Sequence, residues 1–361
     1  MTVHSNQRNP WARLKKNKAA VGGMIVIIIA FFTALFAYFI SPDSSPDANR
    51  MIVEIGGRKP GFKQHFLLVP KEGFVHESST LERLMYGKHD RFDYIPIQKF
   101  KWRTDSVIVD KYIDDGVTER IAYHASLFQA GEKQHIVVKK FFLGTDKYGR
   151  DILSRLIIGV RVSLAVGIVT VLLSLFIGVL LGSVAGYYRG RADDIIMWFI
   201  NVVWSIPTLL LVFAITLVLG KGFWQVFIAI GLTTWVNVAR LIRGQVLGLR
   251  ELEYIEAGRA LGFSSARIIA RHILPNVMGP VIVIAASNFA TAIVIEAGLS
   301  FLGIGVQPPQ PSWGLMIKEN YNFIITQNPM LALAPGFAIM ILVLAFNMLG
   351  NGLRDALQVK T

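Results

Sequence analysis

The chain has 361 residues, 53% of them hydrophobic, and a mean hydropathy of +0.48. Soluble domains of this length are less apolar, so the composition excludes an ordinary soluble protein and favours an integral membrane protein. The formal net charge is +13, yet several long stretches carry no charge at all. The lack of cysteine excludes disulfides, thiolate-held clusters and a cysteine nucleophile.

Six apolar stretches can cross a bilayer, which takes about 20 helical residues for about 30 Å of hydrocarbon. The first, residues 19–40, follows a basic tail at 1–18. The other five lie between Arg161 and Arg189, between Asp194 and Lys221, from Gly222 to about Ala239, from beyond Pro275 to about Ile295, and within 330–349. The sequence therefore predicts an all-α integral membrane protein with six transmembrane helices.

Lysine and arginine near the ends of the spans mark the cytoplasmic side. The tail holds five of them and no acid, and six arginines lie between 240 and 271, ahead of the fifth span. The short segments on the other side hold only Lys221 and Lys318 as basic residues. Both termini are therefore expected in the cytoplasm. A cleaved signal peptide is the alternative for 19–40, but the apolar run is too long and no small-x-small cleavage motif follows it.

Residues 41–140 are the one sizeable region outside the predicted spans. They open with SPDSSPDAN, which is typical of a linker. Four runs rich in β-branched and aromatic residues follow, at 66–69, 106–109, 120–123 and 135–142. The sequence predicts a small β-rich insertion on the extracytoplasmic side. Its mixed charges fit an ordinary solvated surface better than a dedicated binding face, and both interpretations stay open.

Three features inside the spans are candidates for packing or for a transport pathway. Gly178, Gly182 and Gly186 share one helix face, where another helix can approach closely. This contact either packs the subunit or slides during transport. Pro207 is expected to kink the third span, because it lacks an amide and its ring clashes with the preceding turn. Glu296 lies in an apolar stretch, where it is either part of a substrate pathway or a solvated carboxylate at the interface.

Residues 249–276 form the most informative segment, and they are too long for a simple turn. The apolar residues follow a helical period that Gly262 interrupts, and a second short helix follows, which Pro275 is expected to help end. Such a cytoplasmic elbow suits insertion into a groove of a soluble partner. An amphipathic helix resting on lipid headgroups is the alternative.

This segment resembles the EAA loop of type I ABC importer permeases, whose pattern is EAA, three residues, Gly, nine residues and I-x-LP. The matching positions are Glu256, Ala257, Gly262, Leu274 and Pro275. Gly258 stands where the family usually has Ala, and His272 where it has Ile. The resemblance implies that the first helix of the elbow, with Gly258 included, couples the chain to an ATP-binding subunit.

Two further stretches are similar to the C-type subunits of oligopeptide, dipeptide and nickel importers. They are GTDKYGRDILSRLIIGVRVSL at 144–164 and EAGLSFLGIGVQPPQPSWG at 296–314. The resemblance covers about 141–357, the permease core, and leaves out 41–140. It implies a multi-pass subunit of the bacterial cytoplasmic (inner) membrane that transports di- or oligopeptides, with nickel as the alternative substrate.

The resemblance also implies the partners of this subunit. They are a homologous B-type permease subunit, two ATP-binding subunits that hold ATP and Mg, an extracytoplasmic substrate-binding protein and membrane lipid, with no nucleic acid. The chain has no G-x-x-x-x-G-K-[ST] phosphate loop, so it is not expected to be the ATPase. As a transport subunit it is expected to bind no cofactor or metal and to catalyse nothing. A membrane-embedded enzyme would need convergent acids, bases or metal ligands, and the seven histidines lack ligand spacing. A sensor that binds its ligand through 41–140 remains a third hypothesis.

Overall fold

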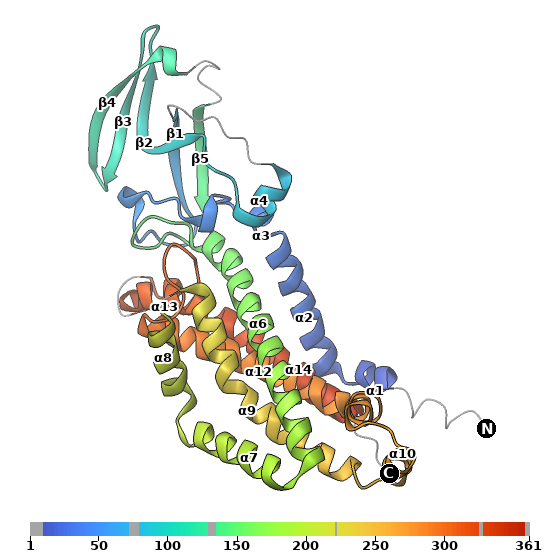
Figure 1. Ribbon diagram of the computed structural model, residues 1–361. Helices are drawn as coiled ribbons and strands as arrows, with labels where there is room; N and C mark the ends of the chain where they lie inside the picture. The colour runs from blue at the N-terminus through green and yellow to red at the C-terminus, as the bar shows by residue number, and fades with distance from the viewer. Residues whose placement is uncertain (1–9, 72–78, 129–134, 221, 325–327, 358–361) are drawn as a thin grey trace, which may run out of the picture. The chain divides into compact units, whose positions relative to one another are not determined.

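The computed structural model describes residues 10–71, 79–128, 135–220, 222–324 and 328–357. The chain divides into two compact units. The helical unit contains residues 1–31, 163–307 and 339–361, and the sheet unit contains 32–162 and 308–338. Each unit is described by itself (Figure 1).

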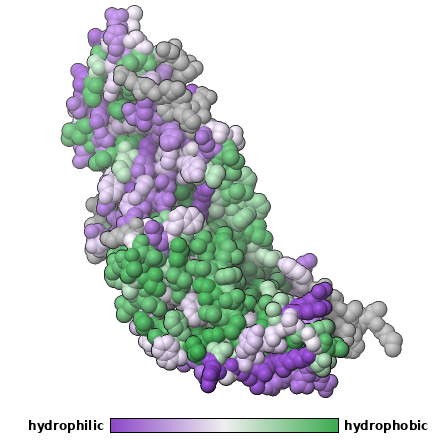
Figure 2. All heavy atoms as spheres, in the orientation of Figure 1, coloured by the Kyte–Doolittle hydropathy of each residue, from purple (hydrophilic) through white to green (hydrophobic). Residues whose placement is uncertain are grey.

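Among the described residues, five helical segments are long and apolar enough to cross a membrane. They are α2 (Lys18–Leu35), α6 (Ile152–Tyr188), α9 (Phe223–Leu249), the continuous segment Ser265–Leu302 and α14 (Met330–Leu357). A sixth span results if α7 (Gly190–Ser205) and α8 (Thr208–Leu219) count as one broken helix. Figure 2 shows hydrophobic residues over much of the exposed surface of the helices, as lipid contact requires. The chain is therefore a largely helical, multi-pass membrane protein.

The third predicted span is broken where the sequence indicated only a kink. Helices α7 and α8 meet at 95° around Ile206 and Pro207, both of which have extended backbone. The 12 residues of α8 reach about 18 Å at 1.5 Å per residue, less than the hydrocarbon thickness. Pro207 alone explains a kink. The larger bend requires the contacts that α7 makes elsewhere.

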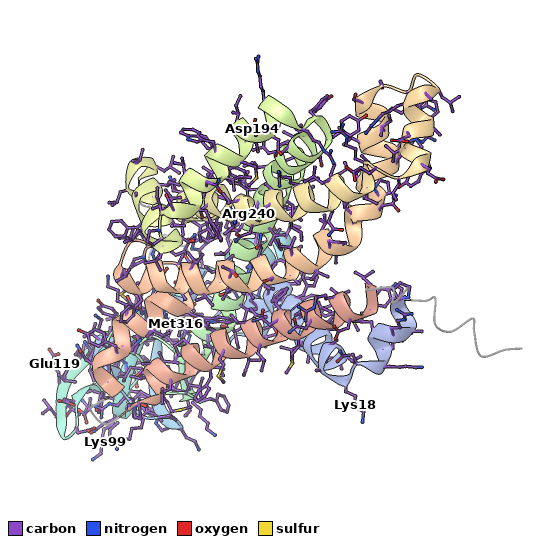
Figure 3. All side chains as sticks on the ribbon, turned by 90° about the horizontal axis from the view of Figure 1, so that it is seen from below. Lys18, Lys99, Glu119, Asp194, Arg240 and Met316 are labelled. Carbon is purple, nitrogen blue, oxygen red and sulfur yellow. The ribbon has the colours of Figure 1, made fainter. Side chains whose placement is uncertain are left out.

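Two arginines of α9 hold α7 in place. Arg243 forms a bidentate ion pair with Asp193, with N–O distances of 2.5 and 2.6 Å. The guanidinium of Arg240 lies 3.8 Å from the ring centre of Trp204 and donates to Asn201. Figures 1 and 3 both show α7 running beside α9, where Figure 3 labels Arg240. These contacts fix the direction of α7 independently of α8.

The shorter elements of the helical unit lie near the ends of the spans. Helix α1 (Pro10–Lys16) ends before Asn17, whose side chain accepts from the Ala20 amide at 3.1 Å and so starts α2. Leu14 of α1 packs with Ala20 and Ala356. The remaining elements are α10 (Glu253–Ala260), α11 (Ser265–Ile268), a π-helical turn η4 (Ile269–Ile273) and α12 (Leu274–Leu302).

A five-stranded antiparallel sheet dominates the sheet unit, in the order β4-β3-β2-β1-β5. The strands are β1 (Phe62–Pro70), β2 (Phe92–Trp102), β3 (Ser106–Asp114), β4 (Val117–His124) and β5 (Ile136–Phe141). The four predicted runs correspond to β1, β3, β4 and β5, which confirms a small β-rich region. The sequence analysis missed β2, which contains Pro96, and proline weakens a strand prediction. Short helices complete the unit: α3 (Ala37–Ile40), α4 (Thr80–Tyr86) and α13 (Trp313–Asn320).

The predicted linker after the first span is in fact packed. Asp43 is only 3% exposed, its amide donates to the Ser154 hydroxyl at 2.8 Å, and its carboxylate pairs with Arg50. Ala48 is buried in a cluster with Tyr38. The linker interpretation is therefore wrong, because Asp43 finds a buried partner in Ser154, 111 residues away, and a nearby ion pair with Arg50.

Candidate functional site

The segment between α9 and α12 contains the helix α10, a turn at Gly262 and the short helix α11, which continues into α12. Helix α10 ends in a Schellman motif, in which the amide of Gly262 donates to Arg259 O at 2.9 Å and the amide of Phe263 donates to Gly258 O at 3.0 Å. Gly262 has φ +79°, a conformation that favours glycine. The hydroxyl of Ser264 then caps α11. Glycine at 262 thus sets the direction of the turn.

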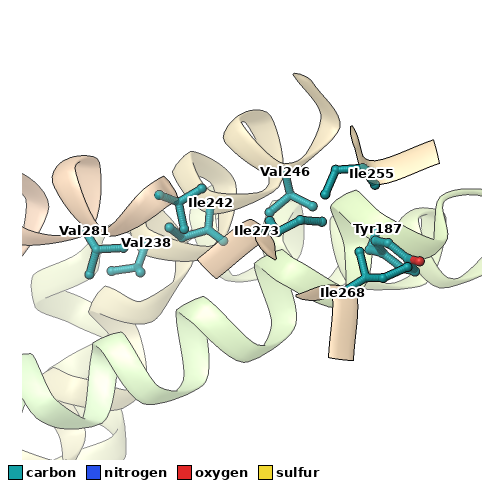
Figure 4. Packing of buried hydrophobic residues seen from close by; sticks show 9 residues of the cluster. Tyr187, Val238, Ile242, Val246, Ile255, Ile268, Ile273 and Val281 are labelled. Carbon is teal, nitrogen blue, oxygen red and sulfur yellow. The ribbon is translucent and has the colours of Figure 1, made fainter. Parts of the chain in front are cut away.

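One face of α10 is buried against the membrane helices. Ile255 is 1% exposed and Gly258 is also buried. Ile255 belongs to a cluster with residues of α6, α9, η4 and α12 (Figure 4). Its buried members are Tyr187, Val238, Ile242, Val246, Ile255, Ile268, Ile273, Val277 and Val281. A displacement of α10 must therefore act on the ends of these helices.

A second face of α10, beside the buried one, is exposed and contains large side chains. Tyr254, Ala257 and Leu261 follow a helical i, i+3, i+7 spacing, and Leu261 is 74% exposed. Glu256 and Gly262 are exposed as well. An apolar stripe with an adjacent carboxylate, on a helix whose other face is fixed, is suited to contact another surface.

The predicted residues at the far end of the elbow lie in the first turn of α12. Leu274 packs against the buried cluster, whereas Pro275 is exposed. The expectation that Pro275 helps end the second helix is wrong, since α11, η4 and α12 run on without a break. Proline is tolerated in the first turn of a helix, and the π turn before it marks a change of hydrogen bonding.

Charged residues that the sequence analysis used only for topology attach the elbow to the end of α6. Arg250 donates to the carbonyl of Tyr187 at 2.5 Å, and the guanidinium of Arg259 lies 5.2 Å from the ring centre of Tyr187. Arg189 and Glu251 form an ion pair. Burial, and then the positive charges of Arg259 and Arg189, lower the pKa of Arg250. Cations at a helix C-terminus also interact favourably with its dipole.

The three glycines of α6 face α9 within the same chain. An added Cβ would lie 2.5 Å from Val238 Cβ at Gly178, 2.5 Å from the Ala239 carbonyl oxygen at Gly182, and 2.8 Å from Val246 Cβ at Gly186. Real Cβ atoms do not come this close, so each position requires glycine. The glycine face therefore packs α6 against α9 within the subunit, and sliding of this contact during transport stays a prediction.

Glu296 is 1% exposed and accepts a hydrogen bond from the Ser300 hydroxyl at 2.6 Å. The alternative of a solvated carboxylate at the interface is therefore wrong. A role of Glu296 in a substrate pathway stays a prediction. Pro207 is exposed, and its place in a pathway stays a prediction.

The two long stretches that resemble C-type permeases meet in the sheet unit. The indole N–H of Trp313 donates to Leu156 O at 3.0 Å. Arg150 is 1% exposed and pairs with Asp146 at 2.6 Å and with Glu319 of α13 at 2.7 Å. Trp313 and Leu156 thus join the two stretches, and Glu319, just beyond the second stretch, pairs with the first.

Comparison with known proteins identifies the family. Residues 178–361, about half of the chain, match the family described as binding-protein-dependent transport system inner membrane component. The chain belongs to this family. Residues 8–53 match the N-terminal transmembrane domain of oligopeptide transport permease C. The predicted resemblance is confirmed, and the chain is a transport subunit.

Three relatives illustrate the similarity. The dipeptide transport system permease protein DppC of Bacillus subtilis is 41% identical over 99% of this chain and 86% of its own length. The glutathione transport system permease protein GsiD of Pectobacterium atrosepticum is 44% identical over 61% of this chain and 72% of its own length. The oligopeptide transport system permease protein OppC of Bacillus subtilis is 41% identical over 62% of this chain and 72% of its own length. Because the first alignment spans nearly the whole chain, it includes residues 41–140.

Proposed function

We propose that this chain is one of two permease subunits of an ATP-driven peptide importer and that α10 is its coupling helix. The observation that carries the proposal is the two-sided packing of α10. One face is fixed to the ends of α6, α9 and α12, and the other exposes an apolar stripe. A helix of this kind can pass the closure of a soluble ATPase to membrane helices as a rigid-body movement.

The proposed topology has six spans, with α7 and α8 forming the third as a broken helix. Both termini and α10 lie in the cytoplasm, and residues 41–140 lie on the extracytoplasmic side of a bacterial inner membrane. The distribution of arginine and lysine supports this orientation. A reporter placed between Arg243 and Arg271 that gives an extracytoplasmic signal would refute it.

The proposed partners are a homologous B-type permease subunit, two ATP-binding subunits and an extracytoplasmic substrate-binding protein, all within membrane lipid. ATP and Mg would be held by the ATP-binding subunits. The family description supports the dependence on a binding protein. The exposed stripe with Tyr254 and Leu261 supports a protein contact on the cytoplasmic side.

Peptides are the proposed substrate. The relatives named above are dipeptide, oligopeptide and glutathione permeases, which favours peptides over nickel. Uptake by the reconstituted complex, offered di- and oligopeptides and nickel in parallel, tests this choice. Accumulation of nickel without any peptide uptake would overturn it.

Two substitutions in α10 test the coupling assignment. Glu256→Lys reverses the charge on the exposed face, and Gly262→Val places a β-branched residue at φ +79°, which is strongly disfavoured. Both variants should insert and pair with the second permease subunit but lose ATPase binding or uptake. If both keep wild-type ATPase binding and uptake, α10 rests on lipid and the assignment fails. A membrane-anchored sensor, the third hypothesis, would copurify with no ATPase at all.

A further inference from the structure

A groove of about 620 Å³ crosses β2, β3 and β4 in the sheet unit. It lies beside a β-bulge in β2, where the pairing with β3 shifts between Ile97 and Lys99. A bulge bends its strand and increases the local twist, which hollows a sheet. Figure 3 labels Lys99 among the strands.

The lining of this groove is strongly basic. It contains Lys99, Lys101, Arg103 and Arg120, against a single carboxylate, Asp110. Asp110 already accepts from Arg120 Nε at 3.1 Å. Lys99, Lys101 and Arg103 are exposed, and no acidic residue in the described ranges pairs with them. Lys99 and Lys101 lie on the same face of β2, because side chains alternate between the two faces along a strand.

Three cations elsewhere around the sheet have carboxylate partners. Lys111 pairs with Glu54 at 2.7 Å, and Lys71 lies 3.5 Å from Asp93. Arg58 pairs with Asp115 at 2.7 Å. The groove gathers four basic side chains around one carboxylate, and its unpaired cations repel one another unless an anionic partner is present.

We propose that this groove binds an acidic segment on the surface of the substrate-binding protein. This inference rests on the proposed function, which places the sheet unit on the side from which substrate is delivered. Carboxylates of the partner would pair with Lys99, Lys101 and Arg103. Electrostatic complementarity of this kind steers association and makes it dependent on salt.

The test compares two double charge reversals in the full transporter complex. Lys99→Glu with Lys101→Glu changes the groove. Lys63→Glu with Lys140→Glu is the matched control, because both lysines are exposed and lie opposite each other on β1 and β5. Affinity for the substrate-binding protein is measured at low and high salt. The groove variant should bind about tenfold more weakly at low salt, with the difference shrinking at high salt, while the control stays within about twofold.

Equal loss in both variants, or no loss in the groove variant, would overturn the inference. Unchanged affinity for the binding protein together with lost binding to anionic phospholipid vesicles would assign the groove to lipid headgroups instead, and would also overturn it. ATPase copurification should be normal in both variants. If the wild-type complex assembles and imports peptides, and the groove variant binds the substrate-binding protein as tightly as the wild type does, only the inference about the groove is refuted. A wild-type complex without ATPase or binding-protein-dependent uptake refutes the proposed function itself.

Discussion

Adding the same methyl group at two glycines four residues apart should have opposite effects on α10. Gly262 has φ +79° and no atom within 4 Å of an added Cβ, so the penalty for alanine is purely conformational. A left-handed backbone costs a non-glycine residue about 1 to 2 kcal/mol. Gly258 is helical, and its added Cβ would make an ordinary 3.4 Å contact with Phe263. Alanine there should stabilise the helix by up to about 1 kcal/mol.

Amide hydrogen exchange over residues 253–263 of the reconstituted complex measures this local stability. A change of about 1 kcal/mol corresponds to about fivefold in the opening equilibrium. Gly262→Ala should therefore speed exchange at least about fivefold, and Gly258→Ala should slow it by up to the same factor. Exchange unaltered by Gly262→Ala, or accelerated by Gly258→Ala, would refute the assignment of Gly262 as the residue that shapes the elbow.

Three further results are expected. Gly182→Leu should abolish recovery of intact complex because its Cβ would lie 2.5 Å from the Ala239 carbonyl, whereas Gly248→Leu, with open space around it, should be recovered normally; equal yields would refute the α6–α9 seam. The chain has no cysteine, so Arg189→Cys and Glu251→Cys can be joined selectively by a short bis-maleimide. If α6 and the elbow move as one body, the cross-link should leave the rate of uptake within about twofold of the uncross-linked variant. Loss of uptake on cross-linking alone would show that they slide past each other. Glu296→Gln keeps an acceptor for Ser300 and should transport normally, whereas loss of uptake in an assembled complex would support a pathway role for this residue.

Hydropathy and glycine chemistry determined much of this protein at the level of sequence. The spans can be predicted from the sequence because each must satisfy its own backbone hydrogen bonds in hydrocarbon and therefore needs a long apolar run. The turn after α10 can be predicted because a helix end with left-handed backbone favours glycine, and Gly262 has this conformation. The three glycines of α6 predict a helix contact for a similar reason, since close approach of two helices leaves no room for a Cβ atom.

Tertiary structure alone decided the features that depend on distant partners. Asp43 and its neighbours have the composition of a linker, yet Ser154 and Arg50 bury them. Strand β2 forms despite Pro96 because β1 and β3 pair on either side of it. The arginines of the elbow count toward topology from composition alone, and only the fold brings Arg250 to the end of α6. Composition and the local spacing of apolar residues indicate which secondary structure a segment can form in water or in lipid. Burial and pairing energies depend on which segments the fold brings together.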